Sequence, residues 1–163
     1  MCFFFVVIFM LISQNPYALD LNLSDIDKPT IEFFNVKEYE LNQDGVKLEA
    51  SASKAQRFQD KDILYDINIL MTQNNGSQTL KSDNATLANN IVYLNGNVRY
   101  IGNGTTVTTE SVEYHQNRDM LIGKTPFRVE KDNIVARGNS FSYRIKLGKF
   151  DASGIKAVIQ TER

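Results

Sequence analysis

Leu80-Lys-Ser-Asp-Asn-Ala85, followed after a short turn by Tyr93-Leu-Asn-Gly-Asn-Val98, is one copy of a pattern that recurs along this chain. Each copy has an apolar residue, a polar step, a second apolar residue, a turn and another strand-like run. Successive copies start about 27 to 30 residues apart, which is typical of a stacked two-strand unit that cannot bury its apolar face alone. The copies begin at Ala50, Leu80, Val107 and Val135, and the last has one extra residue before its second apolar position, Phe141. The repeat predicts a fold of stacked hairpins.

Apolar and polar residues also alternate with a period of two. Examples are Ile67-Asn-Ile69, Val98-Arg-Tyr100 and Phe141-Ser-Tyr143, in runs rich in β-branched and aromatic residues. Because no crossover helices are available, the strands must pair antiparallel. We therefore predict an all-β fold, an open antiparallel β-jellyroll whose hairpins share one apolar trough. A closed barrel and a two-sheet sandwich are the alternatives.

The chain starts with an uninterrupted apolar run, Met1 to Ile12, and carries no charge before Asp20. Twelve helical residues reach about 18 Å, less than the ~30 Å hydrocarbon core of a bilayer. The run could be a membrane anchor that begins upstream, a signal peptide cleaved near Ala18, or a core element; the first two place the rest outside the cytoplasm. We expect a membrane anchor or signal segment (1–19), an acidic linker (20–29) and a β-jellyroll domain (30–163).

Composition argues against several classes of function. The formal net charge is -1, and no basic run is interleaved with aromatic residues, so nucleic acid is not an expected partner. The single cysteine, Cys2, excludes an intrachain disulfide and a cysteine-based metal site. A single histidine, His115, cannot form a metal site alone and is expected in an exposed loop. We expect neither a metal nor a cofactor.

Two short motifs resemble those of serine penicillin-recognising enzymes, namely Ser51-Ala-Ser-Lys54 and Ser82-Asp-Asn84. That chemistry requires the serine at the start of a helix, so that the lysine one turn later can reach it. Here the segment alternates like a strand, which is expected to place Ser51 and Lys54 on opposite faces. We therefore expect no enzymatic activity.

The two ends of the predicted sheet differ in polarity. The first edge, Thr30 to Tyr39, carries Glu32, Lys37 and Glu38, which are typical of a blunted edge strand. The last edge, Ile155 to Thr161, has one charge and no proline, which favours docking of another sheet by β-augmentation. The predicted docking residues are Ile155, Ala157, Val158 and Ile159.

The apolar leader, the acidic tether and the hairpin roll together resemble the LptC family, the bitopic inner-membrane members of the lipopolysaccharide export bridge. The local matches are Leu80 to Leu87 leading to Ile91 to Val98, then Val107 to Val112 and Val135 to Gly138. These structural motifs are shared with the soluble periplasmic bridge protein LptA. The leader and the single repeat array favour LptC.

The resemblance implies a non-enzymatic, single-pass inner-membrane protein whose main domain lies in the periplasm of a Gram-negative bacterium. Its N-terminal edge would face the jellyroll domains of the inner-membrane ABC transporter subunits, and its C-terminal edge would receive LptA. Lipopolysaccharide would pass from one to the other with its acyl chains in the trough. The alternatives are a soluble periplasmic LptA-like bridge protein and an exported β-sandwich glycan-binding module, which the lack of Trp disfavours.

A relay needs a trough that is open. Each buried methylene contributes about 0.8 kcal/mol, so complete enclosure of several acyl chains would prevent their release. For every candidate the competing interpretation is ordinary core packing, and we expect about half to be core only. The predicted lipid-binding residues are Phe34, Val36, Tyr65, Ile67, Ile69, Tyr93, Val98, Tyr100, Val112, Tyr114, Ile122, Phe127, Val129, Phe141 and Tyr143.

Overall fold

The protein is an open antiparallel sheet of twelve strands in a computed structural model that describes residues 28–42, 45–73 and 76–159. Every pairing between described strands is antiparallel, so the predicted all-β class and strand direction are confirmed. The elements are β1 (Ile31–Asn42), β2 (Gly45–Arg57), β3 (Asp62–Gln73), β4 (Gly76–Ala88), β5 (Ile91–Gly102), β6 (Thr105–His115), the 3-10 turn η1 (Gln116–Arg118), β7 (Met120–Gly123), β8 (Phe127–Lys131), β9 (Ile134–Gly138), β10 (Ser140–Arg144), β11 (Lys149–Ser153) and β12 (Lys156–Ile159).

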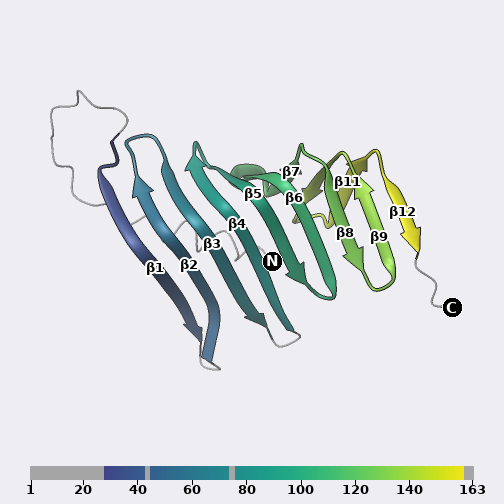
Figure 1. Ribbon diagram of the computed structural model, residues 1–163, viewed down its shortest axis with the longest axis horizontal. Coiled ribbons are helices and arrows are strands. Elements are labelled where there is room, and N and C mark those ends of the chain that lie inside the picture. The colour runs from purple at the N-terminus through teal and green to yellow at the C-terminus, as the bar shows by residue number, and fades with distance from the viewer. Residues whose placement is uncertain (1–27, 43–44, 74–75, 160–163) are drawn as a thin grey trace.

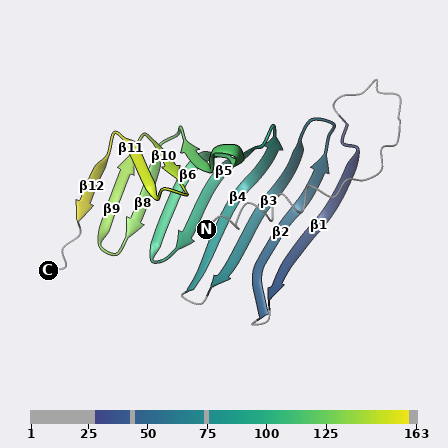
Figure 2. The ribbon, with the colours of Figure 1, turned by 180° about the vertical axis from the view of Figure 1, so that it is seen from behind.

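Strands β1 to β6 are long and lie side by side in sequence order (Figures 1 and 2). The first copy of the repeat forms the hairpin of β2 and β3, and the second forms the hairpin of β4 and β5. In both copies the strand-like halves predicted from the sequence fall inside single strands. The first half of the molecule is therefore a stack of hairpins, as the repeat predicts.

The later copies depart from the predicted hairpins because their strands are broken. The run Met120 to Phe127 is divided between β7 and β8, and Val135 to Phe141 between β9 and β10. Strand β6 pairs with β8 through Thr105–Thr109 and with β7 through Glu113–His115. The sheet therefore forks at β6 into one branch of β8, β9 and β12 and another of β7, β10 and β11.

The breaks continue a line of bends that crosses the whole sheet, which we call the bend line. In β1, β3 and β5 it is marked by Asn35, Asp66 and Asn97, whose φ angles are 53°, 51° and 49°. Asn and Asp adopt this left-handed region more readily than most residues. Pairing aligns these positions across the strands, and the line ends at the β9–β10 break at Asn139 and the β11–β12 break at Gly154.

The bend line divides the sheet into two walls. We call the part that contains β8, β9 and β12 the β8 wall, and the part that contains β7, β10 and β11 the β10 wall. The alternation of buried and exposed residues shifts by one position where a strand crosses the line. Leu64 and Ile67 of β3 are therefore both buried although they are three residues apart. The inner faces of both walls therefore contribute to one core, which includes the fully buried Leu48, Ile69 and Val92.

The described sheet has one N-terminal edge strand, β1, and two C-terminal edge strands, β11 and β12. The sequence predicted a single C-terminal edge and did not identify the strand at Phe150 as a second edge. Three of the predicted docking residues lie on β12, and Ile155 lies in the turn before it. Val158 and Ile159 are both 63% exposed, so the apolar character of this edge is presented to solvent.

The predicted segment 1–19 and most of the predicted linker lie outside the described residues, and so do Gln160 and Thr161 of the predicted last edge. Among the residues that are described, no helix is long and apolar enough to cross a bilayer.

Candidate functional site

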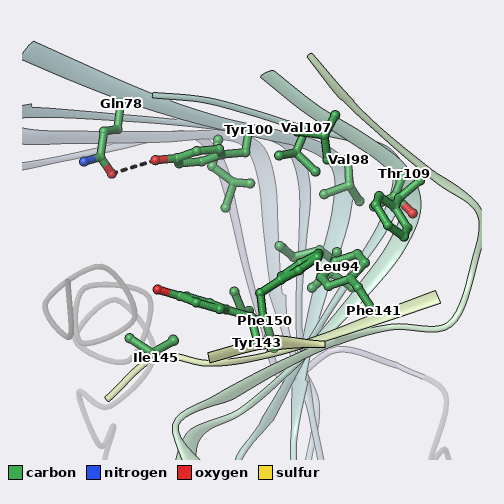
Figure 3. Close-up of a pocket in the computed structure, with 15 residues that line it drawn as sticks. Gln78, Leu94, Val98, Tyr100, Val107, Thr109, Phe141, Tyr143, Ile145 and Phe150 are labelled. Carbon is green, nitrogen blue, oxygen red and sulfur yellow. Dashed lines mark hydrogen bonds between the residues drawn. The ribbon is translucent and has the colours of Figure 1, made fainter. Parts of the chain in front are cut away.

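An open cavity of about 300 Å³ lies between the two walls in the C-terminal half of the sheet (Figure 3). Its surface is almost entirely apolar, and it opens to solvent on one side. Because the walls are the two halves of one bent sheet, side chains from seven different strands or their ends meet across it. The lining residues are Gln78, Leu80, Leu94, Val98, Tyr100, Val107, Thr109, Val112, Leu121, Phe127, Val129, Phe141, Tyr143, Ile145 and Phe150.

Aromatic rings connect the two walls at one end of the cavity. Phe127 of the β8 wall packs edge-on against Phe141 of the β10 wall, with ring centroids 5.2 Å apart. Phe141 stacks on Phe150 of β11 at 5.8 Å, and Tyr143 lies 6.5 Å from Phe150. Such pairs contribute about 0.5–1.5 kcal/mol each beyond the area that they bury. The cluster therefore stabilises the angle between the walls.

Two glycines make room for these rings. A Cβ atom on Gly123 would lie 2.1 Å from Cε1 of Phe141, and one on Gly138 would lie 2.4 Å from Cε1 of Phe127. Both distances are well inside van der Waals contact, so any side chain at either position would displace the ring. Glycine within a strand is typical of a position where another group approaches the backbone closely.

The few polar groups of the cavity are arranged unevenly. The amide of Gln78 and the hydroxyls of Tyr100 and Tyr143 point to the same side of the cavity (Figure 3). The Tyr100 hydroxyl donates a hydrogen bond of 3.2 Å to Oε1 of Gln78. Burial raises the pKa of Tyr100, because an apolar surrounding disfavours the phenolate, and the nearby Tyr143 raises it further. The site can therefore hold hydrocarbon against its walls and a polar group at that side.

The other half of the sheet is closed by packing. Between the walls at β1 to β4 lies a small void of about 20 Å³, lined by Val36, Ala50, Ser51, Ala52, Leu64, Ile67, Ile69 and Ala85. Three of these residues are alanines, and their small side chains allow the walls to approach closely. Space for a ligand is thus concentrated between β4 and β11.

The cavity brings together seven of the predicted lipid-binding residues, at positions spread over β5, β6, β8 and β10. Three come from β5 and β6, where the predicted alternation is correct on the relevant side of the bend line. Four more come from the short strands after the fork. These residues are Val98, Tyr100, Val112, Phe127, Val129, Phe141 and Tyr143.

The other eight predicted residues do not line the cavity. Ile67, Ile69 and Val36 surround the small void, and Tyr114 is buried with its hydroxyl donating to Oδ1 of Asp119 at 3.0 Å. The remaining four lie on the outer face. For two of them, a strict alternation carried across the bend line assigns the wrong face, because the inward-facing positions shift by one residue there. For the other two, the neighbouring residue on the same strand is the one that faces inward. These four are Phe34, Tyr65, Tyr93 and Ile122.

Eight lining residues were missed from the sequence. Leu80 and Val107 could have been found, since each is the first apolar residue of a repeat copy and equivalent positions should share a face. Ile145 and Phe150 could also have been found, since Ile145 continues the alternation of Phe141 and Tyr143 and Phe150 begins the second half of the last repeat copy. The others are Gln78, Leu94, Thr109 and Leu121.

The candidate catalytic residues do not form a catalytic arrangement. Contrary to the prediction, Ser51 and Lys54 share the outer face, because the bend line lies between them. Ser51 donates to the Asn68 carbonyl, whereas Lys54 pairs with Glu32 at 3.4 Å. Among the described residues, no group of three or more potential metal ligands is present.

His115 is partly buried, which corrects the predicted exposed loop. Its Nε2 lies 3.0 Å from Oε2 of Glu113, whose other oxygen accepts a 2.6 Å hydrogen bond from Lys124. The Lys124 bond, and secondarily His115, hold the pKa of the Glu113 carboxyl below its usual value. These groups lie on the outer face of the β10 wall and form a surface ion-pair cluster.

An open, bent antiparallel sheet with an apolar cavity between its walls defines a β-jellyroll protein able to hold hydrocarbon chains. Residues 1–158 match the family model described as "Lipopolysaccharide-assembly, LptC-related". The chain belongs to this LptC family and is thus a component of lipopolysaccharide transport. Membership implies interaction with lipopolysaccharide and other Lpt proteins, and it agrees with the expected non-enzymatic role.

Solved structures also resemble the chain. The crystal structure of LptH, described as the LptA homologous periplasmic component of the lipopolysaccharide transport device from Pseudomonas aeruginosa, aligns with 85% of this chain and 100% of its own. The sequence identity is 16% and the TM-score is 0.49. No curated protein matches the chain.

Proposed function

We propose that this protein receives lipopolysaccharide from the inner-membrane ABC transporter, holds its acyl chains in the cavity between the walls, and passes it to a periplasmic bridge protein. The observation that carries the proposal is the open apolar cavity in a member of the LptC family. An open cavity binds part of each acyl chain, so the affinity remains low enough for release.

The two ends of the sheet support a relay between neighbouring jellyrolls. Strand β1 would face the jellyroll domains of the transporter, and β11 and β12 would receive the soluble bridge protein LptA. Phe150 on β11 and Val158 on β12 are 50% and 63% exposed, so each wall offers an apolar edge. Backbone pairing at such edges supplies affinity, and side chains supply selectivity.

For the N-terminal segment we propose a single-pass inner-membrane anchor that leaves the jellyroll in the periplasm. The apolar run Met1 to Ile12 supports this, and the family match begins at residue 1. The alternative is a soluble LptA-like bridge protein with a cleaved signal. Mass spectrometry of the N-terminus of the native protein, after membrane and periplasmic fractions are separated, distinguishes the two.

The lipid cavity can be tested with a matched pair of tyrosines on one strand. Tyr100 and Tyr93 are both on β5, but Tyr100 lines the cavity and Tyr93 lies on the outer face. We expect a photo-crosslinking amino acid at Tyr100 to label lipopolysaccharide in cells and the same amino acid at Tyr93 to label little or none. Labelled adducts are measured by immunoblotting for lipopolysaccharide after irradiation.

Equal labelling at both positions, or labelling at Tyr93 alone, would rule out the cavity as the acyl-chain site. A bulky aromatic group is already present at both positions, so the substitution itself should preserve the fold. Expression level and a cooperative urea transition confirm this for each variant.

A further inference from the structure

Three positively charged side chains lie directly opposite one another on the outer face of the β8 wall. Arg128 of β8 pairs in register with Arg137 of β9, and Arg137 pairs with Lys156 of β12. These side chains point outward, because the flanking residues Phe127 and Val129 line the cavity on the inner face. The inner face of this wall is therefore apolar and its outer face is basic.

Like charges directly opposite one another destabilise an antiparallel pair. Arg128 is partly compensated by Glu130 on its own strand. Among the described residues, Arg137 and Lys156 have no ion-pair partner within bonding distance. The structure thus retains unfavourable charge in three adjacent strands, which an anionic ligand would relieve.

The row of residues that pair across the strands with Arg128 continues toward the N-terminal strands, but there the positive charge is balanced. Arg99 of β5 lies opposite Lys81 of β4. The exposed acidic residues Asp83 and Glu110 stand nearby on the bend line. In the three C-terminal strands the corresponding bend-line residues are Pro126, Asn139 and Gly154, none of which is charged. Excess positive charge is therefore confined to β8, β9 and β12.

The three cations line a hollow on the outer surface. Its volume is about 850 Å³, and Thr108 and Asn139 add neutral polar side chains to its lining. Two guanidinium groups side by side offer paired N–H donors that match the oxygens of a phosphate, and the Lys156 ammonium adds a third charge. A hollow of this size can admit a sugar as well as the phosphate that it carries.

We propose that this hollow binds a phosphorylated sugar, namely the phosphate-bearing saccharide of lipopolysaccharide, on the wall whose inner face holds the acyl chains. The proposal rests on the proposed function, because it requires an amphiphile whose two parts lie on opposite sides of one wall. Strands β8 and β9 are each five residues long, so the rim lies about 17 Å from the bend line. The three cations lie at the bend-line end of these strands, so a saccharide that leaves the cavity reaches the hollow by crossing the rim and extending back along the outer face.

The test uses the saccharide alone. Lipopolysaccharide stripped of all acyl chains is titrated into the full chain by isothermal titration calorimetry in 50 mM KCl. We expect the Arg137→Gln/Lys156→Gln variant to bind at least tenfold more weakly than the unmodified chain. The matched control, Lys81→Gln/Arg99→Gln, removes two opposed cations from the same face and should bind normally. Binding should also weaken in 200 mM KCl, because these exposed charges are screened by salt.

Several results would overturn the proposal. They are no binding by the unmodified chain, unchanged binding by Arg137→Gln/Lys156→Gln, and unchanged binding after the saccharide is treated with phosphatase. Equal affinity for inorganic phosphate would indicate an adventitious ion only, and equal affinity for phosphatidylglycerol vesicles would indicate a membrane-contact surface. Because this ligand has no acyl chains, failure of this test would not change the labelling expected at Tyr100. The proposed function is therefore tested separately.

Discussion

At the scale of single residues, the cavity depends on positions that carry no side chain. Gly123 has no room for a Cβ atom, since all three of the nearest atoms belong to the Phe141 ring. Its backbone is not in the left-handed region, so the requirement for glycine is steric rather than conformational. The ring can lie against the backbone of β7 at this point only because of this glycine.

We expect Gly123→Ala to reduce the free energy of unfolding by about 1–3 kcal/mol, because the added methyl group overpacks the ring contact. The cost should be smaller in a Phe141→Leu background, in which the ring is absent. Urea denaturation of the two single variants and the double variant forms a double-mutant cycle. Additive effects would show that Phe141 is not the residue in conflict.

Single residues also limited what could be predicted. The sequence identified the strands around Ile67 and Val98, because alternation and β-branched residues are local signals. It could not place Tyr65 or Phe34, because the left-handed Asp66 and Asn35 reverse the alternation within one strand. Asn and Asp are also common in ordinary turns, so the pattern alone does not distinguish a turn from a bend inside a strand.

At the scale of elements, the edge strand β1 carries a charge on its inner face. Glu38 lies opposite Ala50, which is buried. Its Oε2 is buried and has no hydrogen-bond partner among the described residues. Burial, and secondarily the nearby Glu40, raise the pKa of the Glu38 carboxyl above 4.5. Inward-pointing charge is one way in which edge strands resist unintended pairing.

We expect Glu38→Gln to stabilise the fold at pH 7. Because the pKa of Glu38 is raised in the folded state, the unmodified protein loses stability as pH rises from the unfolded-state value, near 4.5, through the folded-state pKa. The Gln variant avoids this loss. The gain in the urea midpoint should therefore disappear as the pH falls to about 4. Glu110→Gln, on the exposed bend line, is the control. An equal gain at both pH values would contradict this origin.

The C-terminal edge strand β12 offers a second test at this scale. We expect Val158→Arg to abolish capture of purified LptA, because a long charged side chain at an edge opposes pairing with another sheet. Val135→Arg is the matched control, since Val135 lies directly opposite Val158 on the outer face of β9, one strand in from the edge. Pull-down with the purified variants measures capture. Retained capture by Val158→Arg would assign docking to β11 or elsewhere.

The fork is the element-level feature that the repeat could not predict. Alignment of the four copies correctly gives hairpins for β2–β3 and β4–β5. The later copies contain Lys124-Thr-Pro126 and Gly138-Asn139, at which the chain leaves the strand. Proline cannot donate to the sheet ladder, so Pro126 was a usable signal for a break. The pairings of β7 with β10 and of β9 with β12 are long-range, and local sequence does not encode them.

At the scale of the whole molecule, the two ends of the sheet are built differently. Strands of twelve or thirteen residues cross the bend line without interruption in β1 to β5. After the fork, the walls consist of strands of four or five residues. Close packing of small side chains joins the walls at the first end, and aromatic contacts across a cavity join them at the second.

If lipid is handed on from β1 to β11 and β12 as proposed, the difference between a void of about 20 Å³ and a cavity of about 300 Å³ favours the C-terminal end of the domain. A hydrocarbon chain gains about 0.8 kcal/mol for each methylene that it buries, so two additional methylenes favour one end more than tenfold at equilibrium. Lipid arriving over β1 would move downhill toward β11 and β12 without any energy source in this chain. Return would require climbing the same gradient, so under the proposed function the shape of the domain would oppose movement of lipid back toward β1.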